Sequence, residues 1–163
     1  MDDIKQKIIE LCGYMIGFWD GLVMIAVIMI PNIAFAVRCR DGFENLWQNR
    51  FVEIAEQAGR FSCFALMIFN IPGVYMGFET DSALHIYLVA DGLMIAAYCL
   101  IWIICFRKPG MFRAIALSVL PAAVFLASGI MSRYILLVIA AAVFAPAHIL
   151  LSCKNAVALQ KEK

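Results

Sequence analysis

Long uninterrupted apolar runs dominate the chain, and charged residues mark their ends. Five such runs cover about residues 18–37, 61–78, 86–106, 114–131 and 134–151. A helix rises about 1.5 Å per residue, so roughly 20 residues cross the ~30 Å hydrocarbon core of a bilayer. Lipid offers the backbone no hydrogen-bond partner, and the runs lack the two-residue alternation of barrel strands. The pattern predicts an all-α integral membrane protein in which one domain, residues 1–163, forms a bundle of five transmembrane helices.

Composition strengthens this prediction and excludes some partners. Of the 163 residues 64% are hydrophobic and 15% are charged, with a mean hydropathy of +0.89. Soluble domains are about half apolar and a quarter charged, so an ordinary soluble fold is excluded. The net charge of +1 leaves no basic surface for nucleic acid. We therefore expect the lipid bilayer as the main partner and the cell (plasma or inner) membrane as the location.

Positive charge predicts the orientation of the bundle, because Lys and Arg stay on the cytoplasmic side of short connections. With the N-terminus outside, ten of the 13 Lys and Arg residues are cytoplasmic, and only Lys5, Lys7 and Arg133 are outside. The C-terminus is then cytoplasmic. A cleaved signal peptide ending at Ala34-Phe35-Ala36 is the less favoured alternative, because acidic residues occupy its N-terminal region.

The polar segment between the first two runs predicts one further helical element. Residues 47–60 carry an apolar stripe that includes Phe51, Ile54 and Ala58, which is typical of an amphipathic helix. We expect a cytoplasmic extension that continues into the second span without a break. Glu53, Glu56 and Gln57 could line a cytoplasmic vestibule, and a solvated helix face explains these residues equally well.

Five polar residues within or beside the runs are candidates for a substrate or ion path: Asp91, Asn70, Asp20, Asn32 and His148. At about 1.5 Å per residue, Asp91 lies about 24 Å from Arg107 and Asn70 lies about 15 Å from Arg60, near the midplane. By the same count Asn32 and His148 lie about 9 Å from the inner boundary, and Asp20 lies at the outer edge. Ionisable groups at membrane depth cost roughly 2.5–3.5 kcal/mol and often serve a function.

Structural roles for these polar residues remain open alternatives. Asp91 could reach water or pair with Arg133, and His148 could bond to Asn32 or to a carbonyl freed by Pro146. Prolines at 31, 72, 121 and 146 interrupt four of the runs and favour hinges or ligands near the midplane as much as ordinary kinks.

Catalytic and metal-binding patterns are missing from the sequence. The six cysteines form no C-x-x-C pair, no Cys/His spacing matches a zinc site, and no G-x-S-x-G occurs. We therefore predict no catalytic residues, no metal and no cofactor, and an enzyme is the less favoured class.

Two functional hypotheses follow from the polar residues. In the first, the chain is a small carrier or channel for an ion or small solute, in which Asp91, Asn70 and Asp20 form the outer or central site. Asn32 and His148 then form the inner gate, and a homo-oligomer or a membrane partner subunit is expected because five helices enclose little volume. In the second, the chain is a non-transporting subunit or sensor that acts through a protein partner at the helix 47–60.

Overall fold

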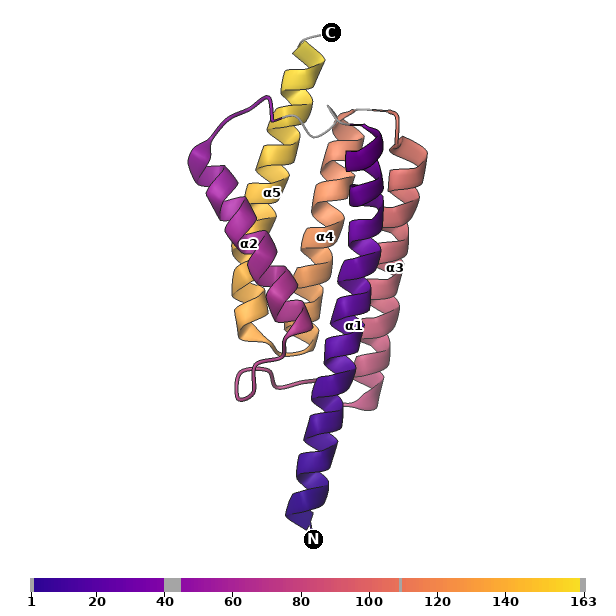
Figure 1. Ribbon diagram of the computed structural model, residues 1–163, viewed down its shortest axis with the longest axis vertical. Coiled ribbons are helices and arrows are strands. Elements are labelled where there is room, and N and C mark those ends of the chain that lie inside the picture. The colour runs from indigo at the N-terminus through magenta and orange to yellow at the C-terminus, as the bar shows by residue number, and fades with distance from the viewer. Residues whose placement is uncertain (1, 40–44, 109, 162–163) are drawn as a thin grey trace.

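Five helices form a bundle whose two chain ends lie at opposite ends (Figure 1). The computed structural model describes the backbone of residues 2–39, 45–108 and 110–161. The helices are α1 (Asp2–Arg38), α2 (Arg50–Ile68), α3 (Asp81–Cys105), α4 (Met111–Met131) and α5 (Ile135–Lys161). We call the end where α3 begins and α4 meets α5 the Asp81 end, and the end where α3 stops the Cys105 end.

Four helices are long and apolar enough to cross a membrane: α1 from Gly17, α3, α4 and α5. They correspond to four of the five predicted runs, so the all-helical fold and these four apolar helices are confirmed. Their outward faces carry large apolar side chains such as Ile30, Ile103 and Ile130, which are 64%, 75% and 59% exposed. A surface this apolar suits lipid rather than water.

The second predicted span, residues 61–78, is wrong in its boundaries. The helix at this place, α2, ends at Ile68, and Phe69 is already extended. Residues 69–80 form an irregular loop, because Pro72 lacks a backbone N–H and Gly73 has φ +83°, a conformation that favours glycine. Pro72 therefore belongs to a true break between helices, and neither predicted alternative, a hinge or a kink within a span, holds for it.

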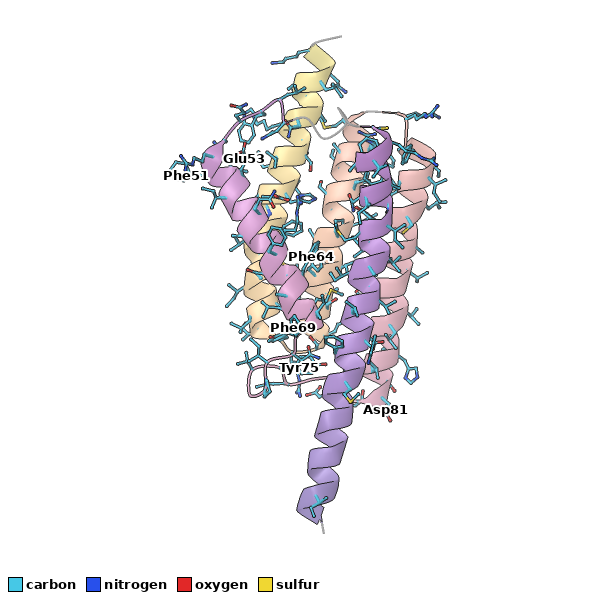
Figure 2. All side chains as sticks on the ribbon, viewed as in Figure 1. Phe51, Glu53, Phe64, Phe69, Tyr75 and Asp81 are labelled. Carbon is cyan, nitrogen blue, oxygen red and sulfur yellow. The ribbon has the colours of Figure 1, made fainter. Side chains whose placement is uncertain are left out.

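The predicted extension at residues 47–60 is the first half of α2. The helix begins at Arg50, where the Asn49 side chain accepts a hydrogen bond from the Val52 N–H and caps it. Figure 2 places Phe51 near one end of the bundle and Phe69 near the other, so α2 runs obliquely along the bundle and does not project from it. It packs on α5 at Gly59, where an added Cβ would lie 2.9 Å from the Phe144 backbone.

α2 buries one charged residue against the bundle together with small and apolar residues, namely Glu56, Gly59, Cys63 and Met67. Glu56 is fully buried, whereas Phe51, Ile54 and Phe61 are 88%, 57% and 65% exposed. The predicted stripe therefore exists, but it faces outward.

The loop after α2 is fixed to the α4–α5 connection. Tyr134 donates a hydrogen bond from its hydroxyl to the Phe69 carbonyl at 3.2 Å and accepts one from the Ile71 N–H at 3.3 Å. Tyr75 contacts Tyr134 edge to face with ring centroids 5.5 Å apart. The predicted midplane position of Asn70 is therefore wrong, because Asn70 lies in this loop at the Asp81 end.

Candidate functional site

Two cavities enter the bundle, one from each end. The larger, of about 1660 Å³, lies toward the Cys105 end, and we call it the Glu56 cavity. The smaller, of about 830 Å³, lies toward the Asp81 end, and we call it the Asn70 cavity. They share no lining residue. Small molecules usually bind in concave sites, so both cavities are candidate sites.

All five helices contribute to the Glu56 cavity. Its wall holds two of the predicted path residues, Asn32 of α1 and His148 of α5, and the whole acidic cluster of α2. Its charged side chains are Arg38, Arg50, Arg60, Arg107, Arg113, Glu53 and Glu56. Of the two predicted roles for the acidic cluster, a vestibule wall is the one that this geometry favours.

Glu56 is the centre of a charged cluster in the cavity wall. Its side chain is 0% exposed, and its Oε1 lies 2.9 Å from Nδ1 of His148 and also accepts a hydrogen bond from Arg60 one turn later. The His148 ring stacks on Phe144 with centroids 4.7 Å apart, which fixes the imidazole. The second oxygen, Oε2, is buried without a hydrogen-bond partner. A buried polar atom in a cavity wall is open to a ligand or to water.

The partner of His148 is thus Glu56, and the predicted bonds to Asn32 or to a freed carbonyl are wrong. Asn32 instead donates from Nδ2 to the Tyr98 hydroxyl at 2.7 Å and to the Ile28 carbonyl at 2.8 Å. Asn32 and His148 therefore face one cavity from different walls and each bonds to a different helix.

The Asn70 cavity contains two other predicted path residues, Asp20 and Asn70. The Nδ2 atom of Asn70 is buried without a hydrogen-bond partner, close to Gly17 of α1. Ser128 and Tyr87 also line this cavity. Polar groups from α1, α3, α4 and the loop 69–80 therefore converge here.

Asp91 lies directly behind the wall of the Asn70 cavity. It is 0% exposed, and its Oδ2 accepts a hydrogen bond of 2.5 Å from the Ser128 hydroxyl. Its Oδ1 is buried without a partner. The predicted pairing with Arg133 is wrong, because Arg133 bonds to Glu79 at 2.9 Å on the surface. Asp91 is thus a buried carboxyl group that contacts a hydroxyl and, within the described chain, no cation.

A layer of buried apolar side chains closes the space between the cavities. On α1 the Asn70 cavity ends at Asp20 and the Glu56 cavity begins at Ile28, with Met24 and Ile25 buried between them. Ile95 and Ala141 continue this layer on α3 and α5, at 7% and 0% exposure. On α2 the layer is thinnest, because Phe64 lines the Glu56 cavity and Leu66 lines the Asn70 cavity. Asp91 borders it on α3, between Tyr87 of one cavity and Tyr98 of the other.

Four of the five predicted path residues thus divide between the two cavities, and Asp91 lies between them beside the apolar layer. Arg113, Tyr98 and Ser128 were not predicted as site residues. The spacing of four residues does predict the pair of Glu56 and Arg60, and this pair is present in the structure. The contacts between helices have no such local sequence signal. Among residues 2–39, 45–108 and 110–161, no group of three or more His, Cys, Asp or Glu side chains is placed to hold a metal ion.

Comparison with protein-family models, with curated proteins and with solved structures finds no match to this chain.

Proposed function

We propose that the chain is a cell-membrane protein that acts as a small carrier or channel for an ion or small solute. The observation that carries this proposal is the pair of cavities at opposite ends, separated by the thin apolar layer. Such a closed path is what a carrier between access states or a shut channel requires, because water must not cross continuously. In this proposal Asp91, Asn70 and Asp20 serve one side, and Asn32 and His148 serve the other.

We also propose that α2 lies in the membrane as a fifth crossing. Its exposed apolar stripe faces away from the bundle, and its charged residues face the Glu56 cavity, where water can reach them. Polar residues in membranes usually face the protein interior or a water-filled cavity in this way. Five crossings place the chain ends on opposite sides, and the Lys and Arg distribution puts the N-terminus outside and the C-terminus in the cytoplasm.

The apolar layer provides a test that needs no knowledge of the substrate. Ile95→Ser introduces a small polar side chain into the layer, and Ile25→Ser does the same from α1. Ile103→Ser is the matched control, because this residue is on α3 but is 75% exposed on the outward face. We expect K⁺ and Cl⁻ leakage from proteoliposomes to rise about tenfold or more in the layer variants, since each ~1.4 kcal/mol removed from a barrier is a factor of ten in rate.

The leak result distinguishes transport from the main alternative. If folded Ile95→Ser and Ile25→Ser proteins both leak no more than Ile103→Ser, the two cavities are not parts of one path. The non-transporting subunit or sensor would then be the better proposal. The exposed stripe of Phe51, Ile54 and Phe61 on α2 would be its docking face.

A further inference from the structure

We infer that the Glu56 cavity binds an organic anion with an apolar body, and that Arg113 holds the charged group. This inference rests on the proposed function, because it names the solute class that enters one end of the path. It depends on the charge balance of the cavity, on the surroundings of Arg113 and on the apolar remainder of the wall.

Cationic side chains outnumber acidic ones in this cavity. Five arginines and two glutamates line it. Both glutamates already have donors: Glu53 accepts from Asn45 at 2.6 Å and from the Asn49 N–H at 3.3 Å, and Glu56 is bonded to Arg60 and His148. The remaining arginines therefore give the cavity a positive potential that attracts anions.

Arg113 is placed to bind an anionic group. It lies in the first turn of α4, half-buried, with its guanidinium 4.9 Å above the Phe35 ring and 6.0 Å from the Trp102 ring. Its bonds to the Cys105 and Phe106 carbonyls are long, at 3.4 and 3.3 Å. No carboxylate in the described part of the chain pairs with it. A guanidinium has five N–H donors, so donors remain for a carboxylate or phosphate.

The start of α4 adds to this attraction. Its N-cap is Gly110, which has no side chain to satisfy the first backbone N–H groups. Free N–H groups and the positive end of the helix dipole favour an anion at this position. Gly110 and Arg107 line the same cavity as Arg113, so the positive groups converge on one place near the Cys105 end.

The deeper wall of the cavity is apolar. Leu117, Pro121, Phe125 and Phe144 line it, and Phe125 and Phe144 are packed edge to face with centroids 5.6 Å apart. The volume of about 1660 Å³ exceeds the roughly 300–1000 Å³ of ordinary ligand pockets. A small hydrated ion would leave this apolar surface uncovered, whereas an alkyl or isoprenoid chain would cover it.

The test measures binding of four probes that share a ten-carbon chain. Equilibrium dialysis uses the full-length protein in nanodiscs of phosphatidylcholine, with decanoate, decyl phosphate, decanol and decyltrimethylammonium. We expect the two anions to bind saturably, and inorganic phosphate alone not to displace them at the same concentration. Equal saturable binding of decyltrimethylammonium, or displacement by inorganic phosphate, would overturn the inference.

Variants locate the site. Arg113→Gln should weaken decyl phosphate binding about tenfold or more, since a charged hydrogen bond is worth roughly 1.5–3 kcal/mol. Arg113→Lys keeps the positive charge and should weaken decyl phosphate binding less than Arg113→Gln does. Arg133→Gln is the control, because this arginine lies on the surface at the Asp81 end. Identical binding by wild type and Arg113→Gln refutes the assignment. The ion leak of Ile95→Ser uses no organic anion, so failure here and failure of the transport proposal remain distinguishable.

Discussion

Glu56 and Asp91 are both fully buried carboxyl groups, but their surroundings differ. Glu56 contacts Arg60 and His148 in the wall of a large cavity, whereas Asp91 lies behind a smaller one, accepts a hydrogen bond from the Ser128 hydroxyl and pairs with no cation in the described part of the chain. A buried charge is tolerated when cations surround it, and an isolated acid is more easily buried in its neutral form. We therefore expect removal of the cation beside Glu56 to be costly and removal of the carboxyl charge at Asp91 to be tolerated.

The difference shows why burial alone does not define a site. Each residue has one carboxyl oxygen without a partner, Oε2 of Glu56 and Oδ1 of Asp91. At Glu56 the free oxygen belongs to a residue that lines a cavity, whereas Asp91 borders the apolar layer. The first arrangement suits ligand binding, and the second suits a group beside the closed part of the proposed path.

The largest effect is expected from removal of Arg60, the cation that pairs with Glu56. Arg60→Met leaves a fully buried carboxylate with an imidazole beside it. Breaking a fully buried pair costs about 3–5 kcal/mol, and the cost here is lower because the Arg60 side chain is 35% exposed. Thermal unfolding in detergent should show a strongly destabilised protein. Adding Glu56→Gln to this variant removes the unpaired charge and should restore most of the lost stability. If Arg60→Met and the double variant are equally stable, Glu56 is not a charged partner of Arg60.

A smaller effect is expected at Asp91. Ser128→Ala removes the hydroxyl that donates to Asp91 and should cost about 1–3 kcal/mol, the penalty for a buried polar group left without its partner. Asp91→Asn keeps the shape of a neutral acid, so its stability should stay close to that of wild type. If Asp91→Asn lowers the stability as much as Arg60→Met does, then Asp91 is a charged group in a compensated site, as Glu56 is.

Sequence reasoning recovered the part of the fold that depends on unbroken apolar runs. The helices α1, α3, α4 and α5 are long and apolar enough to cross a membrane, and that property is visible in single segments. α2 was predicted in part. The continuation of the amphipathic segment into the second apolar run without a break is confirmed, because α2 is one helix from Arg50 to Ile68. Its end was missed, because Pro72 and Gly73 end the element earlier than hydropathy suggests.

The candidate site was predictable only as far as individual residues stand out. Asp91, Asn32 and His148 were visible because polar groups are rare in apolar runs. Their partners were not, since the Glu56–His148 and Asp91–Ser128 contacts join residues 92 and 37 positions apart. Such pairing depends on how helices are rotated and packed, which hydropathy does not encode.

The most direct test of the two-cavity path is the accessibility of its two ends and its closed layer. Leu84→Cys lines the Asn70 cavity, Ala114→Cys lines the Glu56 cavity, and Ala141→Cys lies in the buried layer. Each variant is made in a background without native cysteines and treated with a membrane-impermeant maleimide in sealed vesicles of known orientation. We predict that Leu84→Cys is labelled only from outside, Ala114→Cys only from the cytoplasmic side, and Ala141→Cys from neither. Labelling of Leu84→Cys and Ala114→Cys from the same side, or of Ala141→Cys as fast as both, would contradict the proposed path.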